Sequence, residues 1–293
     1  MNSVLETEDL TKRFRGKAAL SHCTLDVPQG HVVGLVGPNG SGKSTLLNIA
    51  AGLLSPTEGT VRVLGDPPAS SSAQLARVGF VAQDTPLYSS FSVSDHLRYG
   101  KHVNPGWDDD LARRRIDQLG LDLAQRAGKL SGGQRAQVAL TLAIAKRPEF
   151  LLLDEPVASL DPLARREFLQ ILMETVADHG VSVVLSSHLV SDIERVCNYL
   201  VVLVTSRVQL AGDVDDLLAS HHRLIGPRDA PPPENQAIIE SSYTDRQSTL
   251  LVRSDGPITD SRWTVEAVNL EDLVLAYMGQ GRGHRGSTTE ESA

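Results

Sequence analysis

The chain has 293 residues and a net charge of −8, with an isoelectric point near 5.6. General nucleic-acid binding usually needs a basic surface, so this acidic balance predicts no nucleic-acid partner. The two cysteines, Cys23 and Cys197, lack the CxxC spacing of a metal motif and favour a reducing compartment over a disulfide framework. Residues 1–10 are acidic and lack the apolar core of a signal peptide, and every apolar run is far shorter than the ~20 residues of a membrane helix.

The first two hundred or so residues predict strands, then helices, then an alternation of the two. Residues 3–36 alternate polar and apolar side chains, which is typical of antiparallel strands, and residues 60–64 continue that small sheet. Residues 92–147 have a helical pattern that begins with a capping-box sequence. Strand and helix then alternate through Val204, as in a parallel α/β core. We therefore expect one α/β domain over residues 1–225.

The sequence after this domain predicts a linker and a small second domain. Residues 226–236 contain three consecutive prolines and read as a linker. Residues 237–279 combine two short strand signals with a helical pattern over the last ten, which indicates a small α+β domain. Residues 280–293 are polar and rich in glycine, so we expect them to be disordered.

A glycine-rich loop with a lysine follows the apolar run Val32–Val36 and precedes a helical pattern. Strand, loop and helix in this order are the context that a phosphate-binding P-loop requires, and they outweigh the alternative of a glycine-rich turn with a chance lysine. Its backbone N–H groups would surround the phosphates, Lys43 would add a positive charge at the β and γ groups, and Ser44 would offer Mg²⁺ a hydroxyl. The predicted ATP-binding residues of this loop are Gly37, Pro38, Asn39, Gly40, Ser41, Gly42, Lys43, Ser44 and Thr45.

A second phosphate-binding sequence, Leu-Ser-Gly-Gly-Gln at residues 130–134, begins a helical segment that ends before Pro148. By itself it could be an ordinary capped turn or an anion-binding helix N-terminus. The order of the motifs decides between them. Gln83, residues 130–134, the apolar run ending in Asp154 and Glu155, residues 159–161, and His188 follow one another. In this order the chain resembles the nucleotide-binding subunits of ABC (ATP-binding cassette) proteins over roughly residues 3–220.

The resemblance implies an α/β P-loop NTPase core with an antiparallel β subdomain and a helical subdomain at about residues 85–148, followed here by the small C-terminal α+β appendage. It also implies a metal site. Asp154 ends a wholly apolar strand, where a carboxylate needs a cation or another partner, and Mg²⁺ held by Ser44, Asp154 and Gln83 would supply it. The alternative is an Asp that merely caps a loop.

The resemblance also gives roles to four side chains around the phosphates. Glu155 is expected to act as general base on the attacking water, although a purely structural ion pair stays open. His188 and Gln83 are expected to sense the γ-phosphate and complete the catalytic set, whereas a lone His at a strand end is more often a satisfied surface group. Phe14 stands where the family carries an aromatic that stacks on adenine, with a strand-packing Phe as the alternative.

Members of this family pair head to tail, so that the signature of one subunit completes the pocket of the other. The residues expected to bind ATP in this way are Ser131, Gly132, Gly133 and Gln134, and Asp161 would lie in the D-loop that crosses the interface. We therefore expect a dimer, most simply of two copies, because one chain holds one cassette.

The expected function is the ATPase subunit of a membrane transporter, cytoplasmic and peripheral on the inner face of the membrane, with its transmembrane permease on separate chains. Residues 87–91 would face the permease or pack inside the helical subdomain. Residues 269–279 resemble the closing helix of cassettes that serve ABC-2 type exporters, which favours export. The alternative is a non-transport ABC ATPase that acts on ribosomes or nucleic acid.

Overall fold

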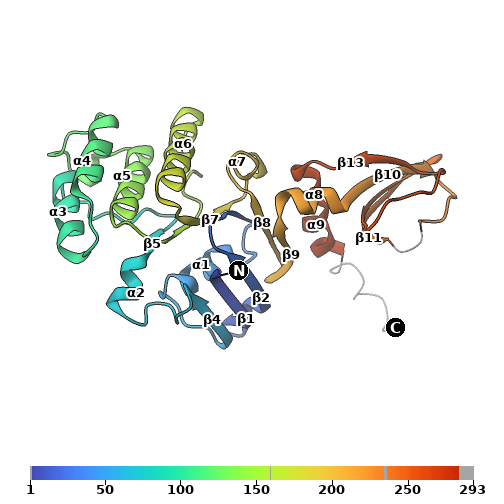
Figure 1. Cartoon of the computed structure of the whole chain (residues 1–293), viewed down its shortest axis with the longest axis horizontal. Coiled ribbons are helices and arrows are strands. Elements are labelled where there is room, and N and C mark those ends of the chain that lie inside the picture. The colour runs from blue at the N-terminus through green and yellow to red at the C-terminus, as the bar shows by residue number, and fades with distance from the viewer. Residues whose placement is uncertain (1, 159, 234–235, 284–293) are drawn as a thin grey trace, which may run out of the picture.

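The computed structural model describes residues 2–158, 160–233 and 236–283. An elongated molecule carries the helical subdomain at one end and a small antiparallel sheet at the other, with the main sheet between them (Figure 1). Three sheets account for its strands, and two of them belong to the predicted α/β domain. None of the described helices is long and apolar enough to cross a bilayer.

The N-terminal sheet is antiparallel, with the strand order β2-β1-β4. Its strands are β1 (Ser3–Phe14), β2 (Lys17–Pro28) and β4 (Glu58–Val63). The apolar side chains on alternate positions of β2 are buried, which agrees with the predicted alternation.

The central sheet has the order β5-β6-β7-β3-β8-β9, and only β9 runs antiparallel to its neighbour. Its parallel strands β3, β6 and β7 are buried at every position, which explains the apolar runs of β3 and β6 and of residues 183–185 in β7. Because these strands are parallel, the residues after them meet at one edge. The strands are β3 (Val32–Val36), β5 (Val78–Val81), β6 (Phe150–Leu153), β7 (Ser182–Ser187), β8 (Tyr199–Val204) and β9 (Arg207–Asp213).

The helices divide between this sheet and the helical subdomain. The subdomain consists of α3 (Val93–Val103), α4 (Asp109–Gln118), the 3₁₀ turn Ala127–Lys129 and α5 (Gly132–Ala145), and it has a hydrophobic cluster of its own. The predicted capping box is confirmed, since the Ser92 and Asp95 side chains each bond to the backbone of the other at the start of α3. The remaining helices of the domain are α1 (Lys43–Ala50), α2 (Ser72–Arg77), α6 (Pro162–His179), α7 (Val190–Glu194) and α8 (Val214–Ser220).

The C-terminal sheet is antiparallel and begins earlier than predicted. Its order is β11-β12-β10-β13, and β10 (His221–Pro227) starts inside the range expected for the ATPase domain and includes the first two residues of the expected linker. Gly226 permits this because a Cβ atom there would lie 2.7 Å from the ring of Trp263. The prolines therefore connect two strands of one sheet instead of two domains. The other strands are β11 (Ala237–Tyr243), β12 (Gln247–Arg253) and β13 (Thr264–Ala267).

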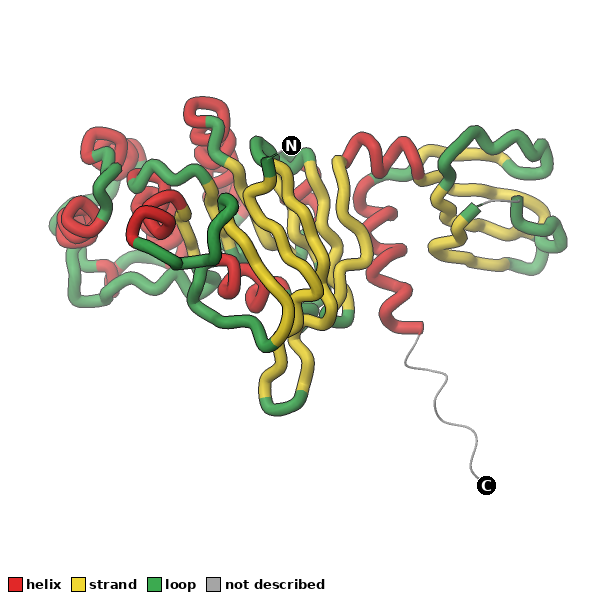
Figure 2. Tube along the Cα trace, turned by 60° about the horizontal axis from the view of Figure 1, so that its bottom comes forward, coloured by secondary structure: helices red, strands yellow, loops and turns green. Residues whose placement is uncertain are grey.

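The last helix, α9 (Leu270–Gly283), ties the C-terminal sheet to the main domain. Leu273, Val274 and Tyr277 are buried in the same hydrophobic cluster as Leu200 of β8 and Ile193 of α7. Figure 2 shows α9 between the main domain and the C-terminal sheet. The helix includes residues 280–283, the first four of the predicted disordered tail. Residues 284–293 of that predicted tail lie outside the described residues.

Candidate nucleotide-binding site

The predicted P-loop connects β3 to α1 and leaves the N-terminus of α1 facing a pocket. Gly42 precedes the helix with φ 112°, a left-handed conformation that favours glycine, and it has no side chain that could cap the helix. Gly37 is required by space, since a Cβ atom there would lie 2.1 Å from the carbonyl oxygen of Leu203. The first N–H groups of α1 are therefore available for an anion.

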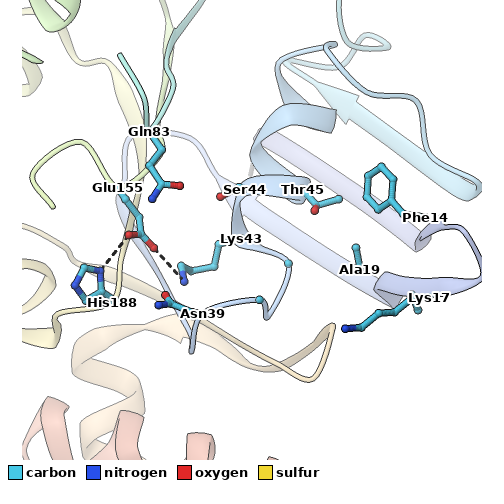
Figure 3. A pocket seen from close by; sticks show the side chains of 13 residues that line it. Phe14, Lys17, Ala19, Asn39, Lys43, Ser44, Thr45, Gln83, Glu155 and His188 are labelled. Carbon is cyan, nitrogen blue, oxygen red and sulfur yellow. Dashed lines mark hydrogen bonds and ion pairs between the residues drawn. The ribbon is translucent and has the colours of Figure 1, made fainter. Parts of the chain in front are cut away.

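A pocket of about 530 Å³ lies against this loop and brings together residues from five predicted motifs (Figure 3). It joins P-loop residues to Phe14, Gln83, Glu155 and His188, as predicted. It also includes residues of the β1–β2 hairpin, which the sequence analysis did not predict. Their position in the chain just after Phe14 could have suggested them. The lining residues are Phe14, Lys17, Ala18, Ala19, Asn39, Gly40, Gly42, Lys43, Ser44, Thr45, Gln83, Glu155 and His188.

Lys43, Glu155 and His188 contact one another in a row at this pocket. The Nζ atom of Lys43 donates to the Gly37 carbonyl oxygen at 2.8 Å and lies 3.3 Å from Oε1 of Glu155. The other carboxylate oxygen, Oε2, lies 3.1 Å from Nδ1 of His188 (Figure 3). The side chains of Lys43 and Glu155 are only 5% and 10% exposed, so solvent ions screen this ion pair weakly. The ion pair that we considered for Glu155 is thus present, and the catalytic role of this residue stays a prediction.

Asp154 lies at the end of β6 and is 2% exposed. Its Oδ1 atom accepts a hydrogen bond of 2.8 Å from the Ser186 hydroxyl, and its backbone N–H donates to the carbonyl oxygen of Val81, two residues before Gln83. The Asp154 carboxylate, the Ser44 hydroxyl and the Gln83 amide are hard oxygen donors of the kind that Mg²⁺ prefers. The donor chemistry of these side chains therefore fits the implied metal.

Phe14 is 45% exposed at the end of β1, which does not agree with the alternative of a packed core side chain. Its ring lies on the pocket beside Lys17 and Ala19 (Figure 3). The Nζ atom of Lys12 lies 5.2 Å from the ring centroid. This placement agrees with a contact to a nucleobase, which stays a prediction.

The signature residues belong to α5, whereas the pocket is lined by residues of other elements. Ser131 caps α5: its hydroxyl accepts from the Gln134 N–H at 3.2 Å, and the Gln134 side chain accepts from the Ser131 N–H at 2.9 Å. The capped turn is therefore real, and one chain does not bring Ser131 to Gly133 into its own pocket. Their contact with a second nucleotide stays a prediction.

Asp161 likewise has a local role, because its carboxylate caps α6 by accepting from the N–H groups of Leu163 and Ala164, each at 3.0 Å. Ser159, the first residue of this motif, lies outside the described residues.

Comparison with known proteins agrees with this geometry. The family described as "ABC transporter" matches residues 20–158. The thiamine import ATP-binding protein ThiQ of Salmonella typhimurium is 34% identical over 213 residues, which cover 69% of this chain and 90% of that protein. The uncharacterized ABC transporter ATP-binding protein YxlF of Bacillus subtilis is 32% identical over 220 residues, 73% of this chain and 72% of YxlF. The chain belongs to the ABC transporter ATP-binding proteins.

Some curated relatives of this ABC protein are considerably longer than the region that they share with it. The sulfate/thiosulfate import ATP-binding protein CysA of Mesorhizobium japonicum is 38% identical over 220 residues, which are 71% of this chain and 63% of that one. A solved ATP-binding subunit of an ABC transporter is 28% identical with a TM-score of 0.67, covering 74% of this chain and 92% of its own. The predicted fold, a P-loop ATPase core with its two subdomains, is confirmed.

Proposed function

We propose that this protein is the ATP-hydrolysing motor subunit of an ABC transporter, and that it works at the inner face of the membrane with permease subunits on separate chains. The observation that carries the proposal is the contact between Lys43, Glu155 and His188 at the phosphate-binding end of α1. ABC membership and the intact motif set support hydrolysis rather than binding alone.

The pocket suggests how ATP would prepare its own hydrolysis. The phosphates would bind the N-terminus of α1, and Lys43 would exchange its contact with Glu155 for the β and γ oxygens. This exchange would free the Glu155 carboxylate to take a proton from the attacking water, while His188 holds the second carboxylate oxygen and reaches the γ-phosphate. Phosphoryl transfer depends mainly on such positioning and on charge neutralisation.

Ser44, Asp154 and Gln83 would hold Mg²⁺ in this pocket. The ion would neutralise charge on the β and γ oxygens when bound. Phe14, at the outer edge of the pocket, would cover the adenine.

The proposal includes a second subunit, and the position of the signature outside the pocket of its own chain supports it. We propose a head-to-tail homodimer in which Ser131, Gly132, Gly133 and Gln134 meet the γ-phosphate held by the partner's P-loop. The Ser131 hydroxyl accepts only one N–H bond in its capping box, so its own proton can be donated to a phosphate oxygen. Asp161 would lie in the same interface.

The permease contact is proposed for an aromatic surface made of Tyr88, Phe91 and Tyr99, and the first two of these rings pack on the buried ring of His96. The rings of Tyr88 and Phe91 lie 5.0 Å apart, and Tyr88 and Tyr99 are 60% and 50% exposed. Leu87 packs on the hydrophobic cluster of the subdomain, as one alternative for residues 87–91 expects, and Tyr88 is exposed, so its contact with the permease stays a prediction. Exposed neighbouring aromatic rings are typical of protein interfaces.

Backbone bonds connect this aromatic surface to the signature. The Ala127 N–H donates to the Phe91 carbonyl oxygen at 2.8 Å, and the Gly128 N–H donates to that of Ser89 at 3.0 Å. These donors lie three to four residues before Ser131, and the same loop begins at Gln83 in the nucleotide pocket. A force on the aromatic surface would therefore reach both nucleotide-contacting segments.

The direction of transport has weaker support. The closing helix resembles those of ABC-2 type exporters, which favours export, whereas ThiQ and CysA are named for import. The comparisons therefore give no support to export, and the direction stays a prediction.

The permease proposal is tested by recruitment. Tyr88→Asp with Phe91→Asp should abolish attachment to membranes that contain the cognate permease and should spare basal ATPase activity. Tyr243→Asp, which changes a 55% exposed tyrosine of the C-terminal sheet, is the matched control and should attach normally. Attachment of the double variant, or stimulation of the protein by ribosomes or nucleic acid instead of the permease, would overturn the proposal in favour of the non-transport alternative.

A further inference from the structure

Ser186 is a polar residue inside the most apolar part of the molecule. It stands near the end of β7, two residues before His188, and is fully buried. Its neighbours along the strand, Val184 and Leu185, belong to the hydrophobic clusters. A buried hydroxyl costs free energy unless it is hydrogen-bonded, so a serine at this position needs polar partners.

The Ser186 hydroxyl makes two hydrogen bonds, both to the site residues at the end of β6. It donates to Oδ1 of Asp154 at 2.8 Å and accepts from the Glu155 N–H at 2.8 Å. A hydroxyl has one proton and two acceptor lone pairs, so both bonds form at once. The parallel pairing of the two strands, with Leu153 opposite Leu185, brings the groups together.

The second of these bonds holds a residue in a demanding conformation. Glu155 has φ 45°, in the left-handed region that a non-glycine residue seldom occupies. Such a backbone persists only where the surroundings fix it. This conformation directs the Glu155 carboxylate toward Lys43 and His188 (Figure 3).

We propose that Ser186 is a positioning residue for nucleotide hydrolysis, which rests on the function proposed above. Its single hydroxyl sets the Asp154 carboxylate for Mg²⁺ and holds the backbone that orients the general base Glu155. Ser186 engages Oδ1 of Asp154 rather than Oδ2, and it thereby fixes the carboxylate as the hydrogen-bonded neighbours of metal ligands do. Neither ATP nor Mg²⁺ would contact Ser186 itself.

Ser186→Ala tests this role through the Mg²⁺ dependence of nucleotide binding. Titration with a fluorescent ATP analogue should show an unchanged affinity without Mg²⁺ and a half-saturating Mg²⁺ concentration raised about tenfold. In ATPase assays at saturating Mg²⁺, kcat should fall while KM for Mg·ATP changes little, because the Glu155 carboxylate is less well held.

Ser182→Ala is the matched control, on the same strand and equally buried. Ser182 is the first residue of β7, at the end of the strand away from the pocket. Its hydroxyl accepts a hydrogen bond of 2.8 Å from the Gly30 N–H. This variant should lose thermal stability to a similar extent without any shift in Mg²⁺ dependence. Equal shifts in both variants, or none in Ser186→Ala, would overturn the proposal.

A second pair of variants decides the matter if the alanine protein does not fold. The side chains in Ser186→Thr and Ser186→Val have nearly the same shape, and valine has a methyl group where threonine has its hydroxyl. We expect the threonine variant to keep the Mg²⁺ requirement within about twofold of wild type and the valine variant to raise it about tenfold. Equal behaviour of the two would contradict the proposal. A wild-type dimer that hydrolysed no ATP would contradict the proposed function itself. Normal wild-type turnover, with the same Mg²⁺ requirement in the threonine and valine variants, would refute only the role of Ser186.

Discussion

The central sheet and the C-terminal sheet of this protein differ in how deeply their strands are buried. The parallel strands β3, β6 and β7 are buried on both faces, and the polar residues that line the pocket lie beyond their carboxyl ends. In the C-terminal sheet, by contrast, every residue of β13 and all but one of β11 are exposed. The candidate site therefore lies at one edge of the first sheet, whereas the second sheet is followed by the helix α9, which packs on the main domain.

The largest expected effect is at the pocket. Lys43→Ala should weaken ATP binding by roughly ten- to a hundredfold, because a charged hydrogen bond to phosphate is lost and Glu155 keeps a buried charge without its partner. Binding of a fluorescent ATP analogue measures this. Lys17→Ala removes the same charge from the exposed edge of the same pocket and should change the affinity far less. Equal losses in both variants would show that the pocket is only a diffuse positive surface.

A smaller effect would sharpen the contrast between the two sheets. Leu273→Ala in α9 and Leu224→Ala in β10 each remove a fully buried leucine and should lower stability by about 2–5 kcal/mol. Leu273 shares a cluster with Ile193 of α7, the helix just after His188, whereas Leu224 belongs to the separate cluster of the C-terminal sheet. Well below the unfolding transition, Leu273→Ala should therefore also reduce kcat, and Leu224→Ala should not.

The smallest effect concerns the junction of the two regions. His221 is fully buried, with Nδ1 donating to the Leu217 carbonyl oxygen at 2.7 Å and Nε2 lying 2.9 Å from the Tyr277 hydroxyl. Burial, with smaller effects from Arg253 and His222, lowers the pKa of His221 below its usual range. The folded protein thus holds this ring neutral, and the unfolded chain binds the extra proton first, near pH 6.5.

Stability from this junction should accordingly be complete above about pH 6.5 and decrease as the pH falls from there toward the lowered pKa of the folded state. Urea unfolding between pH 7.5 and 5 measures it. His221→Gln should lower the stability at pH 7.5 and flatten its decline toward pH 5. An unchanged pH slope in this variant would assign the decline to other groups.

Several residues that line the pocket could be named from the sequence. They either follow a buried strand directly or belong to a motif, such as the P-loop, that always joins a strand to a helix. Lys43, Asp154 and His188 could be placed for this reason. The C-terminal boundary was wrong because β10 follows α8 without a turn signal, and its register with β12 and β13 depends on pairing with strands further along the chain. Ser186 gave no signal either, since a serine at the end of an apolar strand is common and its partners Asp154 and Glu155 come from another strand.

The central claim is that Glu155 activates the water that attacks ATP held by Lys43. Glu155→Gln keeps the size of the side chain and removes its basicity. We expect ATP binding to persist, phosphate release to slow by about a hundredfold or more, and a stable dimer to accumulate on size-exclusion chromatography with Mg²⁺ and ATP. Turnover near that of the wild-type protein, with only monomer present, would contradict the account.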